Sequence, residues 1–185
     1  MNQTDMLLSV QNQGKMVELY THADDLATFA AGMVLAMSND HLILSSITES
    51  GAYDGFVLLP LDSILMQASD TQYLKKLERL QAKDAFPAVD FPNTERLDHA
   101  LLAYAARRHL VVSVELLNSG YYDCRGLIRE VDPDDCLMEA VTTYGEFDGK
   151  RLFPLKNITK IACDTSDEQI LARLIEEPPI SRLDP

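Results

Sequence analysis

Positively charged side chains are almost missing from the first seventy residues of this chain. That stretch holds nine Asp and Glu residues but a single base, Lys15. Proteins that bind nucleic acids gain affinity by neutralising phosphates with Lys and Arg. The first part of the chain is therefore a poor candidate for nucleic-acid binding. The formal net charge of the whole chain is −13, which by itself predicts only a protein kept in solution by charge repulsion.

Paired cysteines and long apolar runs are also missing. The three cysteines (Cys124, Cys136 and Cys163) are far apart and form no CxxC motif. This spacing predicts a reduced, cytoplasmic protein with its thiols packed as small apolar side chains. The longest nearly uncharged run, around residues 29–38, is far shorter than the roughly 20 residues that cross a bilayer. The start of the chain has an early acid and a short apolar stretch, so we expect neither a signal peptide nor a membrane partner.

No known catalytic or ligand-binding motif occurs in the chain. It contains no HExxH, no GxSxG and no Gly-rich phosphate loop, and these are the signals of zinc proteases, serine hydrolases and nucleotide binders. The four histidines have no Cys partner at zinc spacing. Asp132, Asp134 and Asp135 lack the full ligand spacing of a calcium loop. We therefore expect no enzymatic activity, no cofactor, no metal and no small-molecule substrate.

What the chain does have is an internal repeat. Residues 32–71 align without a gap with residues 126–165, and thirteen of the forty positions are identical. The identities are mostly turn residues and apolar positions, including the pairs Gly32/Gly126, Gly51/Gly145, Asp54/Asp148, Gly55/Gly149 and Pro60/Pro154. Backbone geometry and core packing select such positions, so the repeat predicts two copies of one small β unit and says little about activity. Asp54 and Asp148 each precede Gly, which predicts tight hairpin turns rather than an acid–base pair.

Each repeat is expected to be a helix, about five short strands and another helix. In the second copy the residues around 92–95 predict a helix start, and Leu spacing continues the helix to about residue 108. Strands are predicted at 112–116, 124–131, 136–142, 150–154 and 158–163, where apolar residues alternate or turn signals intervene. Pro154 must end the fourth strand because it lacks an N–H, leaving space for one 3₁₀ turn.

In the first copy Thr4 or Asp5 is expected to cap a helix over 6–13. Asp70-Thr71 and Asp164-Thr165 are expected to cap the closing helices. Five bent strands preceded by a helix describe a small SH3-type barrel. The chain then divides into barrel 1 with its helices (1–80), a linker (81–93) and barrel 2 with its helices (94–185).

Residues 112–132 resemble the first signature of the Sm-like (LSm) family. That pattern is alternating apolar residues, a polar residue, Gly, an aromatic, a second Gly, an alternating strand and Asp. It falls here on Val112, Val114, Leu116, Asn118, Gly120, Tyr122, Gly126, Ile128, Val131 and Asp132. The segment LFPLKNI at 152–158 lies where the second signature would fall. The resemblance implies a fold that is mainly β with flanking helices (α+β): two tandem five-stranded Sm-like barrels joined by a helical linker.

The resemblance does not carry over the RNA pocket of the family. The family's base-holding loop residues fall on Asp134, Asp135 and Cys136, and its Arg-Gly falls on Pro154 and Leu155. A carboxylate repels phosphate, and proline neither donates a hydrogen bond nor stacks like a guanidinium.

The repeats differ most on the fourth and fifth strands. The first copy has Phe56, Val57, Leu65 and Met66 where the second has Lys150, Arg151, Thr159 and Lys160. The resemblance implies that these strands pair between neighbouring barrels. An open apolar edge would promote aggregation, so another barrel or the helix over 71–83 is expected to cover it.

Two functional interpretations follow. The first is a non-catalytic assembly or interaction module of the cytoplasm, which contacts protein partners or copies of itself through barrel edges. The second is an RNA-associated protein that uses a basic face of barrel 2. That face would consist of Arg125, Arg129, Lys150, Arg151, Lys156 and Lys160. Clustering of these bases would favour RNA, and dispersal among acids would favour the assembly module.

Overall fold

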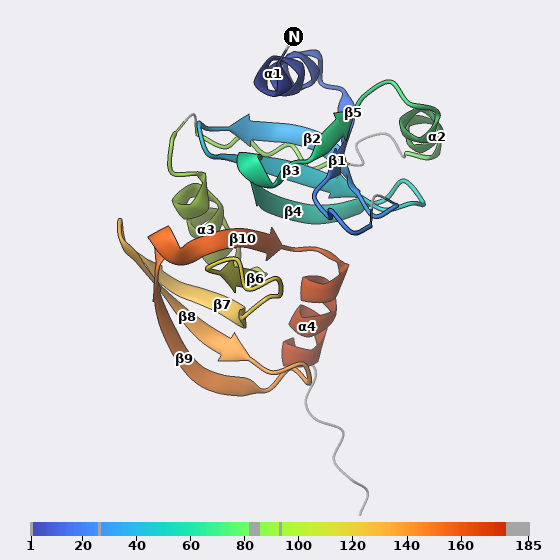
Figure 1. The fold of residues 1–185 in the computed structure, drawn as a ribbon. Helices are drawn as coiled ribbons and strands as arrows, with labels where there is room; N and C mark the ends of the chain where they lie inside the picture. The colour runs from blue at the N-terminus through green and yellow to red at the C-terminus, as the bar shows by residue number, and fades with distance from the viewer. Residues whose placement is uncertain (1, 26, 82–85, 93, 177–185) are drawn as a thin grey trace, which may run out of the picture.

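The computed structural model describes residues 2–25, 27–81, 86–92 and 94–176. Within these residues ten strands form one antiparallel sheet, accompanied by four α-helices and two short 3₁₀ helices (Figure 1). The predicted α+β class, mainly β with flanking helices, is confirmed.

The elements follow one another in the same order twice. The first half consists of α1 (Gln3–Gln13), β1 (Met16–Tyr20), β2 (Ala30–Met37), β3 (His41–Ile47), β4 (Tyr53–Pro60), the 3₁₀ helix η1 (Leu61–Ser63), β5 (Met66–Ala68) and α2 (Gln72–Leu80). The second half consists of α3 (Leu97–Arg108), β6 (Val111–Leu116), β7 (Cys124–Val131), β8 (Asp135–Val141), β9 (Phe147–Pro154), η2 (Leu155–Asn157), β10 (Ile158–Cys163) and α4 (Ser166–Glu176).

The strand order of the first half recurs in the second. The sheet runs β5-β1-β2-β3-β4-β10-β6-β7-β8-β9, so both halves place their strands in the sequence fifth, first, second, third, fourth. The halves join where β4 pairs with β10. The expectation was two five-stranded barrels, whereas the structure has one continuous sheet that does not close. Its two outer strands are β5 and β9.

Polar side chains start the helices as physical chemistry requires, but not always at the predicted residues. Asn2 caps α1: its side chain accepts from the Asp5 backbone N–H, and its own backbone N–H donates to the Asp5 carboxylate, so the helix begins earlier than the predicted Met6. Thr71 caps α2 by accepting from the Leu74 N–H, as predicted. The α3 helix begins at Leu97 with Arg96 at the cap position and no side-chain cap, and the Thr94 hydroxyl accepts from the Arg96 N–H just before the helix. The Asn93 of the predicted cap lies outside the described residues.

The Asp-Gly pairs do not form the predicted hairpin turns. Both lie inside strands, at register irregularities where β4 pairs with β3 and β9 pairs with β8. Only the glycines take positive φ there, 72° at Gly55 and 73° at Gly149, whereas a type I′ turn needs two such residues. The hairpins instead close at Gly51 and Gly145, whose N–H groups donate to Thr48 and Thr142. Asp-Gly therefore encodes a bulge rather than a turn here.

Pro60 and Pro154 occupy equivalent places in the two halves. Each is the last residue of the fourth strand, and each is followed by a three-residue 3₁₀ helix. The predicted strand end at Pro154 and the 3₁₀ turn after it are confirmed.

The largest cluster of buried side chains belongs to both halves. It joins Ile43, Phe56 and Leu58 of the first half to Leu101, Val112 and other residues of the second. The α3 helix contacts β7 and β10 as well as β3 and β4, and in Figure 1 it lies beside the junction. Two smaller clusters lie within the first half, under α1 and under α2.

The predicted linker, 81–93, falls between α2 and α3, and its residues 86–92 form no helix or strand. No helix within the described residues is long and apolar enough to cross a membrane.

Candidate functional site at the junction and the outer strands

The junction between the halves is a short antiparallel ladder. Phe56, Val57 and Leu58 of β4 pair with Cys163, Ala162 and Ile161 of β10. Of these six residues only Val57 is not fully buried. Backbone pairing together with this burial joins the two halves tightly.

The Asp54-Gly55 bulge docks against the first residues of α4. Asp54 Oδ1 accepts from the backbone N–H of Ser166 at 2.8 Å and also from the Ser166 hydroxyl. A carboxylate at this end of a helix satisfies an orphan N–H and faces the positive end of the helix dipole. Gly55 lets the backbones approach, because a Cβ there would lie 2.4 Å from the Thr165 nitrogen. The bulge is therefore shaped for the helix start opposite it.

Aromatic rings complete the junction. Tyr53 donates from its hydroxyl to Asp164 at 3.3 Å, and burial together with the Asp164 charge raises the Tyr53 pKa. The Phe56 ring packs edge-on against Tyr53, Phe91 and Tyr104, with centroids 5.5–5.7 Å apart. Such pairs contribute about 0.5–1.5 kcal/mol each beyond burial.

The outer strands carry the same elements without a partner. Phe147, Asp148 and Gly149 of β9 are the repeat equivalents of Tyr53, Asp54 and Gly55, and all three are exposed. Near Gly149 a Cβ would meet only the Arg151 side chain, at 3.9 Å. At the opposite edge, Asp70 and Thr71 start α2 as Asp164 and Thr165 start α4, with φ of 56° and 59° at the two Asp residues. The two sides of the junction thus recur, separated, at the two ends of the sheet.

The four apolar residues predicted as one edge lie on strands at opposite ends of the first half. Phe56 is 1% exposed, and with Val57 it sits in the β4–β10 ladder. Leu65 and Met66 lie at β5 and are 54% and 45% exposed. They are separated because the first half does not close into a barrel in which β4 and β5 would meet.

The six bases of the alternative interpretation lie on three strands and one 3₁₀ helix, and two of them are paired with acids. Arg129 forms an ion pair with Glu139, and Arg151 with Asp148 at 2.8 Å. Lys150 and Lys156 are exposed, on β9 and η2. Arg125 and Lys160 are half-buried, and both lie over the ring of Tyr122, about 6 Å from its centre. The ring of Tyr122 therefore links Arg125 and Lys160, a contact that no local sequence pattern predicts.

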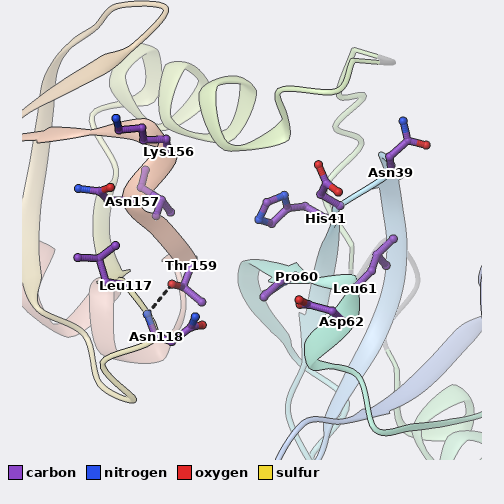
Figure 2. A pocket seen from close by; sticks show the side chains of 12 residues that line it. Asn39, His41, Pro60, Leu61, Asp62, Leu117, Asn118, Lys156, Asn157 and Thr159 are labelled. Atoms are coloured by element: carbon purple, nitrogen blue, oxygen red, sulfur yellow. Dashed lines mark hydrogen bonds between the residues drawn. The ribbon is translucent and has the colours of Figure 1, made fainter.

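A cavity of about 410 Å³ opens where the loops of the two halves face one another (Figure 2). His41, Pro60 and Asp62 line one wall, and Leu117, Asn118 and Lys156 are among the residues of the other. Asn118 donates from its backbone N–H to the Thr159 hydroxyl at 2.9 Å, fixing the second wall.

The residues aligned with the base-holding loop in the Sm-like resemblance, Asp134, Asp135 and Cys136, do not line this cavity. Asp134 and Asp135 are exposed and line a second hollow with Arg96 and Asp98, which form an ion pair at 3.2 Å. Cys136 is fully buried.

The cysteine side chains are packed in apolar surroundings. Burial raises the pKa of Cys124 to about 11 and that of Cys136 to about 12, and it raises the Cys163 pKa strongly. Such thiols are poor nucleophiles at neutral pH. Among the described residues, no three His, Cys, Asp or Glu side chains come together as a metal site.

The sequence could not reveal the docking of Asp54, because Asp before Gly reads as a turn. The one available signal was that the two repeats carry the same residue, Asp54 and Asp148. Its meaning becomes clear only once the strand pairing is known, because that pairing places both residues inside strands.

Comparisons with protein-family models, with curated proteins and with solved structures give no match for this chain.

Proposed function

We propose that this chain is a non-catalytic assembly module of the cytoplasm. In this proposal each half is one Sm-like unit, and copies associate head to tail when β9 of one chain pairs with β5 of the next. The observation that carries the proposal concerns the two sides of the β4–β10 junction. In the repeat, β9 corresponds to β4 and β5 corresponds to β10, and within the described residues the outer edges of β9 and β5 pair with no strand.

The repeat specifies the register of the proposed contact. Ile161, Ala162 and Cys163 correspond to Gln67, Ala68 and Ser69, and Leu58 corresponds to Leu152. Leu152 would therefore oppose Gln67, with Lys150 and Arg151 beside it. In the proposed contact the Asp148–Arg151 ion pair would break. The Asp148 carboxylate would then accept from a backbone N–H at the start of α2 in the next copy, as Asp54 does at the start of α4.

Apolar exposure at the outer strands supports this contact. Leu152 is 71% exposed and Phe147 53%, and at β5 Leu65 and Met66 are about half exposed. Burying one such side chain contributes about 1.5–3 kcal/mol, so several together can support an interface. Because the two outer strands differ, the contact is heterologous, and it builds rings or filaments rather than an isolated twofold dimer.

The alternative, an RNA-associated protein, has less support. Two of its six bases, Arg129 and Arg151, are paired with carboxylates, which leaves four without an ion pair among the described residues. Non-specific binding to RNA needs several unpaired positive charges along one path.

The test of the proposal is the molar mass in solution, measured by light scattering at protein concentrations from about 1 to 100 µM, a range that covers ordinary protein affinities. The wild-type chain is expected to exceed its monomer mass of 20.7 kDa in a concentration-dependent way. The Gly149→Ala variant should be monomeric, because its Cβ would meet the α2 start of the neighbour as a Cβ at Gly55 would meet Thr165. The matched control is Gly120→Ala, which has a similar positive φ of 83° and open space around it, and which should assemble normally.

A mixing experiment tests the polarity of the contact. The double variant Leu65→Thr/Met66→Lys changes only the β5 edge and should also be monomeric, whereas Ile170→Lys changes an exposed apolar residue of α4 and should not. Mixing Gly149→Ala with the β5 variant leaves one intact β9 and one intact β5, so dimers should form and nothing larger. A wild-type chain that stays monomeric at the highest concentration would overturn the proposal.

A further inference from the structure

Another cavity, of about 460 Å³, lies between the two halves of the chain. Pro60 and Ser63 of the first half line it together with Glu115, Tyr122, Arg125 and Lys160 of the second. It shares Pro60, Asn118 and Thr159 with the cavity of Figure 2, so the two cavities are neighbours.

Two positive charges line this cavity beside a single carboxylate, Glu115, which lies opposite Lys160 in the β6–β10 ladder. Lys160 and Arg125 are half-buried, and within the described part of the chain neither forms an ion pair or a side-chain hydrogen bond. The Arg125 Nε is fully buried and has no acceptor there. Removing a charged group from water without a hydrogen-bonding partner is costly, so this arrangement calls for an anion.

The ring of Tyr122 holds the two cations in place. The Lys160 Nζ lies 5.7 Å from its centroid and the Arg125 Cζ lies 6.0 Å from it. Cation–π contact offsets part of the desolvation but leaves the buried Arg125 Nε without an acceptor. Burial also lowers the Lys160 pKa.

One acid lies beside the two bases and offsets part of their charge. Glu115 is the only carboxylate among the lining residues, and its Oε1 accepts from the Gly120 N–H at 3.1 Å. His22 and Tyr121 line the cavity as well. In a chain of net charge −13, two bases beside one carboxylate leave this lining with an excess of one positive charge.

We propose that this cavity binds the phosphoryl group of a small phosphorylated molecule between Arg125 and Lys160. Phosphate offers acceptors to both side chains, and a guanidinium donates two parallel hydrogen bonds to such an anion. This site is separate from the proposed assembly contact, since none of its cavity residues lies on β5 or β9.

Isothermal titration calorimetry with the full chain in a phosphate-free buffer tests the proposal, with inorganic phosphate and adenosine 5′-monophosphate as probes. Both are expected to bind the wild-type chain. Arg125→Gln should weaken binding about tenfold or more, the usual effect of losing a charge-assisted hydrogen bond. Lys160→Met should weaken it similarly.

The matched control is Arg129→Gln, which removes the same charge from the same strand but from an arginine already paired with Glu139. It should leave the affinity within about twofold, as expected for an exposed charge at a distance. Circular dichroism checks the folding of each variant, and Arg125→Lys, which keeps the charge but not the fork, should bind at an intermediate level if Arg125→Gln does not fold.

Three results would overturn the proposal: no heat from either probe at millimolar concentration, equal weakening by Arg129→Gln and Arg125→Gln, or binding of an RNA oligonucleotide with no binding of the small probes. The last result would identify the phosphoryl source as a nucleic acid. The same samples give the molar mass, so failure of assembly and failure of anion binding are separately visible.

Discussion

Asp54 of the first half accepts a 2.8 Å hydrogen bond from the backbone N–H of Ser166, 112 residues later in the chain. This contact joins a strand bulge of one repeat to the helix start of the other. Its counterpart in the second repeat, Asp148, reaches only Arg151 of its own strand. Two identical residues thus have different partners because only one of them lies at the internal junction.

Replacement of Asp54 should cost stability where replacement of Asp148 does not. Asp54→Ala removes the acceptor at the first residue of α4, and losing such a cap costs about 0.5–2 kcal/mol of unfolding free energy. Asp148→Ala removes an exposed ion pair, with an expected effect below about 0.5 kcal/mol. Urea denaturation in the Leu65→Thr/Met66→Lys background measures both without contributions from assembly. Equal losses in the two variants would show that Asp54 does not stabilise the junction.

Gly55 and Gly149 should respond differently to the same substitution. Both have φ near 72°, so alanine at either position costs about 1–2 kcal/mol of backbone strain. At Gly55 the new Cβ would also lie within 2.4–2.5 Å of backbone atoms of Cys163, Asp164 and Thr165. We expect Gly55→Ala to destabilise by at least about 2 kcal/mol more than Gly149→Ala, given the usual cost of overpacking. Matching denaturation midpoints would contradict the close approach.

The buried pair Ser113 and Glu168 offers a test of polar packing. The Ser113 hydroxyl donates to Glu168 at 2.5 Å, with the two residues 0% and 2% exposed. Ser113→Ala leaves a buried carboxylate oxygen without this donor, which should cost about 1–3 kcal/mol. Ser45 is equally buried, but its hydroxyl has no partner among the described residues, so Ser45→Ala should be nearly neutral. Thermal or urea unfolding of the two variants decides whether the hydrogen bond or the volume matters.

The three thiols should be slow to react in the folded protein. Because burial raises the Cys124 pKa to about 11, only about one thiol in a thousand is ionised at pH 8. Cys136 and Cys163 are fully buried and have pKa values raised further. A chromogenic disulfide reagent at pH 8 should therefore label the native chain slowly and all three cysteines rapidly after unfolding in guanidinium. Rapid native labelling of one thiol would point to a reactive cysteine instead of a structural one.

Binding to long nucleic acids should be weak near physiological salt. The net charge of −13 and the pairing of Arg129 and Arg151 with carboxylates leave few bases to displace counterions. A fluorescently labelled uridine- or adenosine-rich oligonucleotide should bind with micromolar or weaker affinity at about 150 mM salt. Submicromolar binding would favour the RNA-associated interpretation over the assembly module.

The sequence by itself determined the local elements of this protein. Apolar alternation placed β7 and β10 at their observed bounds, Pro154 ended β9, and Thr71 capped α2, because each of these depends on neighbours within a few residues. The repeat likewise implied the same strand order in both halves. Gly32 and Gly126 show why such positions recur: at each, a Cβ would lie 2.0 Å from a carbonyl oxygen of the next strand.

Only the tertiary structure decided what lies beside each edge. The Asp-Gly pairs became bulges because their strands continue through them and pair with β3 and β8. Phe56 is buried because β4 pairs with β10, and Met66 is exposed because β5 is an outer strand of the sheet. Arg125 and Lys160, 35 positions apart, meet over Tyr122 only because β10 pairs with β6 and β6 with β7. Pairing between distant strands depends on long-range complementarity, which no local pattern of residues encodes.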